Sequence, residues 1–454
     1  MAQGSKQQNN NMTQHTTPGG MGTFLVIWAG QLVSIIGSGL THFALGVYVY
    51  QTTGSATPLA LVLLANALPR LLFAPIAGAL ADRWDRRWMM ILSDTGAGLA
   101  TLVVWLLLAT GKLQVWHIYL TGAASSFFGI FQQLAYRAAT TLLVPKEHYG
   151  RAAGLVQLGS AIGQIISPIL AGLLVVAIQI QGVILIDFAT YIFAVLTLSF
   201  VRIPRPATTE EGEAGRGSLL REAGYGWGYL KERPGLLGML ILFAFANFSL
   251  GFFSALFTPL ILSFSTADVL GSILTVGGIG MVVGSIVMSA WGGSKRKINS
   301  LMGAIFLGGL ALSLAGLQAN PWLIGAATFG FFVIMPIGNG SSQAIWQVKV
   351  APDVQGRVFA TRSMIATVAT PLAYILAGPL ADKVFEPLMA ADGTLARSVG
   401  TILGVGPGRG IGLIFIIMGL LIALATVVGY LNPRIRLVED ELPDFVADGP
   451  LGRS

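Results

Sequence analysis

The sequence predicts an all-α membrane protein with twelve transmembrane helices, arranged as two six-helix bundles. Of its 454 residues, 54% are hydrophobic and 10% are charged, whereas soluble domains carry roughly 25% charged residues. Apolar runs of spanning length recur along the chain, and the basic residues gather in alternate loops between them. In lipid, runs of this length satisfy their backbone hydrogen bonds as helices, so the fold class follows.

Each span needs about 20 mostly apolar residues. The first candidate begins near Met21 and is too long for the core of a signal peptide, so we expect an uncleaved first helix. In chain order, the twelve candidates are residues 22–50, 58–81, 88–110, 115–138, 152–177, 182–202, 236–263, 269–292, 299–317, 321–344, 357–381 and 410–431.

The spans divide the chain into five parts. Residues 1–20 are polar and are expected to form a disordered tail, and residues 21–202 form the N-terminal six-helix bundle. Residues 203–235 contain Pro, Glu, Arg and Gly but no apolar run of spanning length, which predicts a linker. Residues 236–431 form the C-terminal six-helix bundle, and residues 432–454 form a second tail.

Three smaller segments carry further expectations. The Gly-rich residues 404–412 lie at the end of the longest outer loop and are expected to be flexible or re-entrant. The acidic residues 440–448 are expected to be a solvated terminus. The basic residues 295–297 are expected to serve only as a topology anchor.

The basic residues set the orientation. If the N-terminus is cytoplasmic, 22 of the 27 Lys and Arg residues fall on the cytoplasmic side. Four fall outside (Lys112, Lys383, Arg397 and Arg409), and Arg70 lies within a span. The positive-inside rule therefore predicts a multi-pass protein of the plasma or inner membrane with both tails in the cytoplasm.

The two halves contain a matching pattern. Gly150-Arg151 precedes Ala171-Gly172 by the same spacing at which Gly356-Arg357 precedes Ala377-Gly378. Six spans return the chain to its starting side, so both halves have one orientation. This predicts a parallel repeat whose symmetry axis lies along the membrane normal.

Residues 78–87 read Gly-Ala-Leu-Ala-Asp-Arg-Trp-Asp-Arg-Arg and join the second and third spans. They resemble the signature loop of the major facilitator superfamily of secondary transporters. The runs at 84–94 (WDRRWMMILSD) and 355–388 are similar to the macrolide-efflux and siderophore (enterobactin) exporter branch of that superfamily. The resemblance covers roughly residues 22–431, and it implies two bundles that open alternately to either side of the membrane.

The resemblance implies that the 78–87 loop is a cytoplasmic latch between the bundles. Gly78 permits close packing, and the latch itself is assigned to Asp82, Arg83 and Arg86. The implied partner is the start of the eleventh span, near Arg357, since a helix N-terminus favours an anion. The alternative is that these residues only anchor the loop in the cytoplasm.

The fifth span is similar to the antiporter motif of drug exporters. Small residues permit close helix packing, and a proline removes one helical hydrogen bond and kinks the helix. Such a helix is suited to be a pivot between the bundles, although ordinary small-residue packing gives the same composition. The matching positions are Gly154, Gly163, Ser167, Pro168, Ala171 and Gly172.

Polar residues within spans are the candidates for coupling or for lining a cavity, because charges in the membrane are costly and usually face the bundle interior. Arg70 lies deep in the second span, His42 can titrate near neutral pH, and Asp187 lies nearer the outer surface. Each also has a structural alternative, such as a bond to a neighbouring helix. Five amides complete the set: Gln132, Gln133, Asn247, Asn339 and Gln343.

Several other functions are excluded by the residues present. The chain has no Cys and four scattered His, so we expect no metal site. It has no phosphate-binding P-loop, so no ATP-driven step and no cofactor are expected. The net charge of +7 arises from loop residues that set topology, so it does not predict binding to nucleic acid. Nothing in the pattern predicts an enzyme.

We therefore expect a monomeric secondary transporter in contact with membrane lipid, which exports a small amphipathic compound in exchange for protons. Proton-coupled drug exporters usually carry an Arg inside the fourth span, but here Arg137 appears only at its cytoplasmic end. Two alternatives stay open: a nutrient importer or facilitator, and a non-transporting membrane sensor or lipid-handling protein on the same scaffold.

Overall fold

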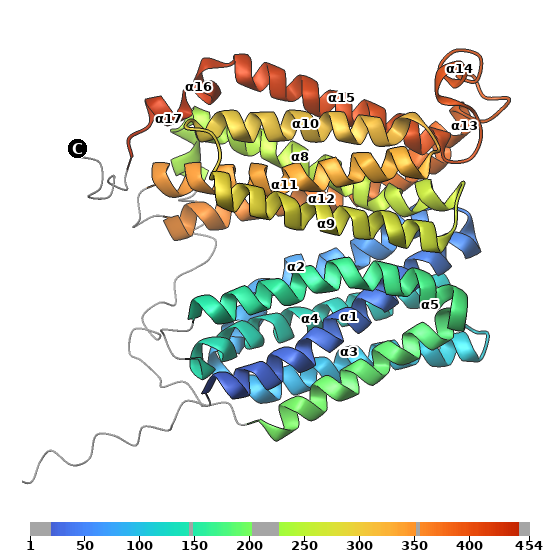
Figure 1. The fold of residues 1–454 in the computed structure, drawn as a ribbon, viewed down its shortest axis with the longest axis vertical. Coiled ribbons are helices and arrows are strands. Elements are labelled where there is room, and N and C mark those ends of the chain that lie inside the picture. The colour runs from blue at the N-terminus through green and yellow to red at the C-terminus, as the bar shows by residue number, and fades with distance from the viewer. Residues whose placement is uncertain (1–19, 145–148, 202–226, 351–354, 445–454) are drawn as a thin grey trace, which may run out of the picture.

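The computed structural model describes residues 20–144, 149–201, 227–350 and 355–444, without some side chains in these ranges. The described residues are mostly helical and include no strand. Figure 1 shows two bundles packed against each other, one made of α1–α5 and the other of α8–α17.

The N-terminal bundle contains five helical segments. The last of them, α5, has 52 residues and reverses direction at Gln179, whose φ of 59° is left-handed, so it contains two helices (Figure 1). The segments are α1 (Gly20–Thr53), α2 (Ala56–Arg83), α3 (Arg86–Ala109), α4 (Val115–Leu143) and α5 (Tyr149–Phe200).

The C-terminal bundle contains six long helices, followed by a folded tail. The long helices are α8 (Pro234–Leu262), α9 (Ala267–Trp291), α10 (Lys297–Leu317), α11 (Pro321–Lys349), α12 (Gln355–Leu380) and α15 (Arg409–Leu431). Short elements follow α12, namely η2 (Ala381–Phe385), α13 (Glu386–Leu388) and α14 (Gly400–Leu403), and the tail holds α16 (Pro433–Arg436) and α17 (Val438–Glu441).

Ten segments of the described chain are long and apolar enough to cross a membrane. One of them runs through both arms of α5, and α4 is not among the ten. The ends of the predicted spans agree with the ends of the described helices to within three residues, except that α4 and α11 run more than a turn further than expected. All-helical membrane architecture is therefore confirmed, while the count of twelve and the six-helix repeat stay predictions.

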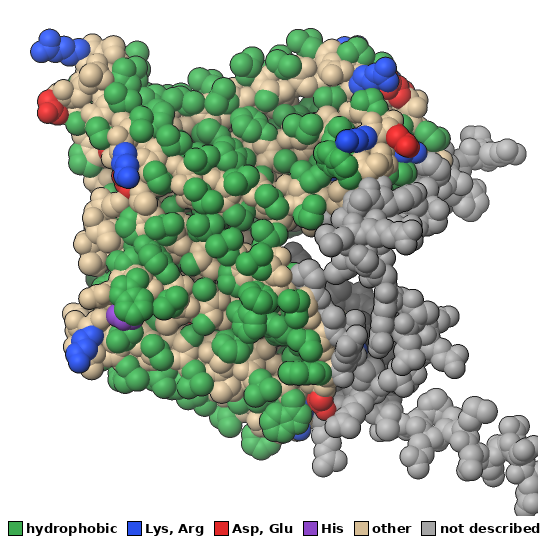
Figure 2. Space-filling model, turned by 180° about the vertical axis from the view of Figure 1, so that it is seen from behind, with side chains coloured by type: hydrophobic (Ala, Val, Ile, Leu, Met, Phe, Trp, Pro, Cys, Tyr) green, Lys and Arg blue, Asp and Glu red, His purple; other side chains and the backbone are tan. Residues whose placement is uncertain are grey.

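Two ends of the molecule are used below to describe positions. The linker end holds Trp84, Val201 and Arg296, and lies on the left of Figure 1. The loop end holds Gly54, Gly111 and residues 381–408, and lies on the right, where α13 and α14 are labelled. Hydrophobic side chains cover much of the surface between the two ends (Figure 2), as expected of a surface that faces lipid.

The loop after α12 and the C-terminal tail are more ordered than the sequence suggested. Glu386 accepts hydrogen bonds from Gly408 N (3.0 Å) and Ile411 N (2.9 Å), so a carboxylate caps the start of α15. Met389 is fully buried. The expectation of a flexible or re-entrant segment at 404–412 is therefore wrong, because the loop folds back onto this helix end.

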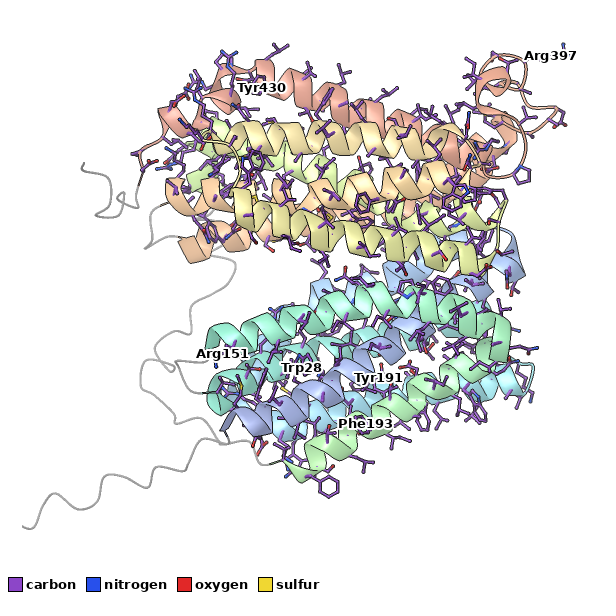
Figure 3. All side chains as sticks on the ribbon, in the orientation of Figure 1. Trp28, Arg151, Tyr191, Phe193, Arg397 and Tyr430 are labelled. Carbon is purple, nitrogen blue, oxygen red and sulfur yellow. The ribbon has the colours of Figure 1, made fainter. Side chains whose placement is uncertain are left out.

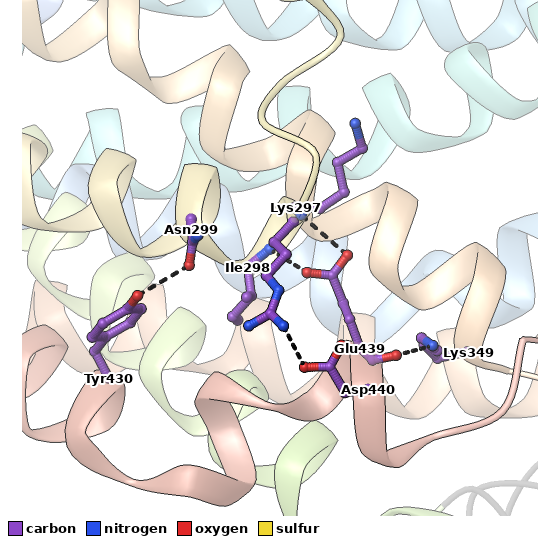
Figure 4. A network of polar contacts seen from close by, with 8 residues as sticks. Lys297, Ile298, Asn299, Lys349, Tyr430, Glu439 and Asp440 are labelled. Atoms are coloured by element: carbon purple, nitrogen blue, oxygen red, sulfur yellow. Dashed lines mark hydrogen bonds and ion pairs between the residues drawn. The ribbon is translucent and has the colours of Figure 1, made fainter.

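The tail is likewise attached to the C-terminal bundle (Figure 4). The carboxylate of Glu439 accepts hydrogen bonds from Lys297 N (3.0 Å) and Ile298 N (2.8 Å) at the start of α10. Asp440 pairs with Arg296 at 3.1 Å, and the buried Lys349 pairs with Asp444. The predicted solvated terminus and simple topology anchor thus contact each other, because a helix N-terminus and basic side chains attract the acidic tail.

Candidate functional site

A cavity of about 410 Å³ lies inside the N-terminal bundle and is lined by all five of its helical segments. Trp28 and Tyr191, which both line it, are labelled in Figure 3. Five of the lining residues can carry charge: His42 on α1, Arg70 on α2, Asp94 on α3, Arg137 on α4 and Asp187 on α5. The cavity therefore combines the features of a small-molecule site with intramembrane ionisable groups.

Arg70 lies on the wall of this cavity and is exposed to it. Its Nε donates to Ser126 Oγ at 3.3 Å, and Ser126 Oγ donates to Asn66 O at 2.6 Å. His42 lines the same cavity within electrostatic range of Arg70. The structure thus brings together two of the residues that the sequence singled out.

Asp187 is only 1% exposed and lies in a polar shell between α1, α3 and α5. Thr190 Oγ1 is 3.4 Å from its Oδ1, and the hydroxyl-bearing side chains of Ser38, Thr41 and Thr101 complete the shell. Among the residues that the structure describes, no ion pair joins Asp187 to Arg70. The polar shell keeps a carboxylate at this depth from being stranded in hydrocarbon.

Asp94 is a second buried carboxylate that the sequence reasoning did not select. It is 4% exposed, and Gln31 Nε2 donates to its Oδ2 at 3.0 Å. Gln132 in turn donates to Gln31 Oε1, so this predicted amide belongs to the Asp94 network. Asp94 could have been selected from the sequence, because it is a single acidic residue inside an apolar run, as Asp187 is.

Two polar side chains, Ser38 and Tyr191, lie near the two carboxylates. Tyr191 lies within electrostatic range of both Asp94 and Asp187, and its hydroxyl is 2.9 Å from Ser38 Oγ. Ser38 also belongs to the polar shell of Asp187. The interface of α1, α3 and α5 therefore holds two protonatable groups with a hydroxyl pair between them.

The remaining amides are divided between the bundles. Gln133 is exposed and lines the large cavity. Asn247 and Asn339 line a separate cavity of about 90 Å³ in the C-terminal bundle. Gln343 Oε1 accepts a hydrogen bond from Arg362 Nη1 at 3.0 Å, which ties it to an arginine that the sequence analysis did not select.

The small residues of α5 lie where this helix meets two others. Ser167 Oγ donates to Ile36 O at 3.2 Å, and a side chain at Gly163 would contact Ile35, both on α1. Ala171 is fully buried. On the other side, a Cβ at Gly172 would lie 3.0 Å from Ala267 O on α9. The motif therefore joins the bundles near the loop end.

Pro168 contributes to the same contact, since a Cβ at Gly271 of α9 would overlap its carbonyl oxygen. Thr275 Oγ1 donates across the interface to Ile165 O at 3.0 Å. At Gly154, nearer the linker end, a Cβ would meet nothing within 4 Å. The close approach of α5 and α9 therefore covers only part of the motif.

A carboxylate from the C-terminal bundle closes the loop end beside α2. The N-cap residue Ser55 does not cap α2 with its own side chain. Instead, Asp382 accepts from Ala56 N (2.9 Å), Thr57 N (2.7 Å) and the hydroxyls of Ser55 and Thr57. These bonds satisfy free N–H groups of the first turn and join the two bundles.

The predicted latch is described only in part. Gly78, Asp82 and Arg83 lie in the last part of α2, and Arg86 begins α3, but the side chains of the first three and of Arg357 lie outside the described residues. Arg87 was not assigned to the latch, yet its guanidinium donates to the carbonyls of Leu198 and Ser199 at the end of α5.

The described residues include no group of three or more His, Asp and Glu side chains placed to hold a metal ion.

Comparisons with known proteins agree with this architecture. The family model described as Major Facilitator Superfamily matches residues 27–374. Macrolide efflux protein A of Streptococcus pyogenes is 31% identical over 368 residues, covering 80% of this chain and 90% of that protein. The enterobactin exporter EntS of Shigella flexneri is 26% identical over 314 residues, covering 68% and 72% of the two chains.

A solved structure shares the fold at low sequence identity. It is a bacterial homolog of the human lysosomal transporter Spinster, in an inward-facing and unoccupied conformation. The TM-score is 0.69 at 13% identity, with 92% of this chain and 98% of that chain covered.

Proposed function

The chain belongs to the Major Facilitator Superfamily of membrane transporters, and we propose that it exports a small amphipathic compound in exchange for protons by alternating access. The observation that carries this proposal is the cavity of about 410 Å³ in the N-terminal bundle, with its buried carboxylates and exposed arginine. Export is supported by the efflux proteins among the relatives, whose names concern macrolides and enterobactin.

The proposal includes twelve crossings with both tails in the cytoplasm. At 1.5 Å per residue, the two arms of α5 together contain about 78 Å of helix, more than twice a hydrocarbon core of about 30 Å. Because the chain reverses direction at Gln179, α5 crosses twice in this proposal. With α4 added, the long helices supply twelve spans in two sets of six. The excess of Lys and Arg near the linker end supports a cytoplasmic location for that end.

The contacts between the bundles support an inward-facing state. Asp382 joins η2, which follows α12, to α2 at the loop end, and Gly172 lies against Ala267 nearby. Toward the linker end the ribbons of the two bundles separate (Figure 1). In this proposal the latch of Asp82, Arg83 and Arg86, with Gly78 beside it, forms when the inside closes and the Asp382 contact breaks.

Proton coupling is assigned to Asp187 and Asp94, with His42 as a third group on the same cavity. Buried carboxylates in membrane bundles are the usual proton carriers of pumps and transporters. Both are enclosed by side chains that can donate or accept hydrogen bonds, so each can exist in either protonation state. This arrangement gives no coupling role to Arg137, the arginine of α4 that lines the same cavity.

The test is transport in inverted membrane vesicles. A proton gradient is imposed, a panel of amphipathic compounds is added, and both accumulation and lumenal pH are followed. Export by antiport predicts accumulation with proton release that disappears when the gradient is collapsed. Accumulation that ignores the gradient would refute proton coupling, and gradient-driven loss from preloaded vesicles would favour a nutrient importer instead.

A further inference from the structure

The charges that face the cavity indicate the class of cargo, on the premise of the exporter proposed above. Arg70 and Arg137 line the cavity and are exposed, whereas Asp94 and Asp187 are 4% and 1% exposed. The carboxylates are enclosed by side chains of α1, α3 and α5. A molecule that enters therefore meets guanidinium groups, although the four charges formally cancel.

Arg70 has hydrogen-bonding capacity that its neighbours do not use. A guanidinium carries five N–H donors in a planar fork. Among the described residues, the structure gives a partner to one of them, the Nε that donates to Ser126 Oγ. The described ion pairs do not include Arg70. An arginine this deep, about 21 Å along α2 from Ala56, usually faces a cavity or pairs with an opposite charge or a backbone carbonyl, and it marks a candidate substrate pathway.

The surroundings of Arg70 fit an anionic group. His42 lines the cavity within electrostatic range of Arg70, and Asn66 lies one turn earlier on α2. Arg137 lies on α4 about 16 Å nearer the linker end than Ser126, the partner of Arg70. The two arginines therefore mark a path from the cytoplasmic mouth to the cavity wall, along which an anion is attracted.

We infer that the cargo is an amphipathic organic anion whose carboxylate, sulfonate or comparable acidic group binds the guanidinium of Arg70. The planar fork of an arginine matches such groups through two parallel hydrogen bonds. The apolar part of the cargo then occupies the remainder of the cavity. Arg137 acts earlier, by raising the local concentration of the anion at the entrance.

The test compares two fluorescent probes that share one apolar core. Anilinonaphthalene sulfonate carries a sulfonate, and N-phenylnaphthylamine lacks it. Binding is measured on the full chain in nanodiscs of zwitterionic lipid, after subtraction of empty discs. For Arg70→Gln we expect sulfonate affinity to fall on the order of tenfold to a hundredfold, the effect of one charged hydrogen bond. The neutral probe should change less than about twofold.

Two further variants separate charge from folding. Arg70→Lys keeps the positive charge without the planar fork, so we expect an intermediate loss, and it keeps the test valid if Arg70→Gln does not fold. Arg137→Gln should slow association and reduce its salt dependence with a smaller effect on affinity. Arg296→Gln, an exposed arginine of the C-terminal bundle, is the matched control and should change neither probe.

The outcomes also separate the two sources of an anionic group. If discs that contain phosphatidylglycerol abolish sulfonate binding, Arg70 holds a lipid headgroup and the cargo assignment is wrong. The cargo assignment would also be wrong if Arg70→Gln lowered the affinity for both probes equally, or for neither. If vesicles export a rhodamine cation equally well with Arg70→Gln, export stands and the anion inference fails. If no compound is transported but Arg70-dependent sulfonate binding persists, the exporter proposal fails alone.

Discussion

The two bundles contain cavities that differ in size and in chemistry. The N-terminal cavity measures about 410 Å³ and has five residues that can carry charge on its walls. The C-terminal cavity measures about 90 Å³, and its described lining holds only Asn247, Ser249 and Asn339 as polar groups among apolar ones. Among the described residues, therefore, the charged side chains that line these two cavities all belong to the N-terminal bundle.

The C-terminal bundle fills its interior instead. Phe253 packs against Phe331 at 5.4 Å and against Phe415 at 5.8 Å between ring centroids. Glycines bring helix backbones together, as at Gly316 and Gly412, where α10 meets α15. Under the function proposed above, this difference corresponds to a division of labour, in which one bundle binds cargo and protons while the other moves against it as a packed unit.

The largest expected effect is the loss of coupling when the carboxylate of Asp187 is removed. Asp187→Asn keeps the shape of the side chain but cannot release a proton, so the rate of gradient-driven export should fall at least tenfold. A tenfold change corresponds to about 1.4 kcal/mol. Exchange of cargo down its own gradient should persist. Vesicle transport with and without a proton gradient measures both, and Asp94→Asn should behave alike.

The matched change in the C-terminal bundle is Asn247→Leu, which removes a polar group from the smaller cavity. The rate of coupled export should stay within about twofold of wild type, well below the tenfold loss, equivalent to about 1.4 kcal/mol, that is expected for Asp187→Asn. If Asn247→Leu stops export while Asp187→Asn does not, the division between the bundles is wrong.

The sequence predicted the helices well and the polar contacts less well. The spans could be predicted because apolar length alone sets them, and Arg70 and Asp187 were selected because charge within a span is rare. Asp94 satisfied the same criterion but lay in a run that was interpreted through its family resemblance. The contact of Asp382 with α2 joins residues more than 300 positions apart, so no local pattern could reveal it.

A second prediction concerns the interface between the bundles. In Gly271→Ala the new methyl group would overlap the carbonyl oxygen of Pro168, so α5 and α9 must move apart. We expect the free energy of unfolding to fall by about 1–3 kcal/mol, as for other overpacked sites, together with slower export. Thermal unfolding of the purified protein measures the first effect and vesicle transport the second.

Gly303 provides the control, because a Cβ there would meet nothing within 4 Å. Gly303→Ala should be neutral or stabilise α10 by about 0.5–1 kcal/mol, the usual gain of Ala over Gly in a helix. Equal destabilisation by the two substitutions would show that the α5–α9 contact does not depend on close approach at Gly271.

A third prediction concerns the closure of the loop end. Asp382→Ala removes the acceptor of the α2 N–H groups, so the outward-facing state should become more populated. Hydrogen bonds to a charged group contribute about 1.5–3 kcal/mol each, so a tenfold shift is expected. The chain has no Cys, so a single Ala60→Cys, at a fully buried position of α2, reports opening through its rate of maleimide modification.

Asp392 is an exposed acid of the same loop, and Asp392→Ala should leave that rate unchanged. An unchanged rate in Asp382→Ala would mean that the contact does not hold the loop end closed. A slower rate would mean that Asp382 favours the outward-facing state.

The smallest effects are expected at the tail of the C-terminal bundle, where the more buried residue should cause the larger loss of stability. Lys349 is 4% exposed and donates to the carbonyl of Glu439 (Figure 4). It also donates to Asp444 and to the carbonyl of Leu442. Lys349→Met should lower the free energy of unfolding by about 1–2 kcal/mol, because these acceptors then depend on water. Arg296 and Asp440 are about half exposed, so Arg296→Gln should cost less than about 0.5 kcal/mol.

Both tail variants should export at the wild-type rate, since the tail contacts only the packed bundle in the described structure. Thermal unfolding and vesicle transport, measured on the same preparations, separate stability from activity. A transport defect in Lys349→Met at a temperature where it remains folded would place part of the mechanism in the C-terminal bundle. The contrast between a chemically active bundle and a packed one would then have to be given up.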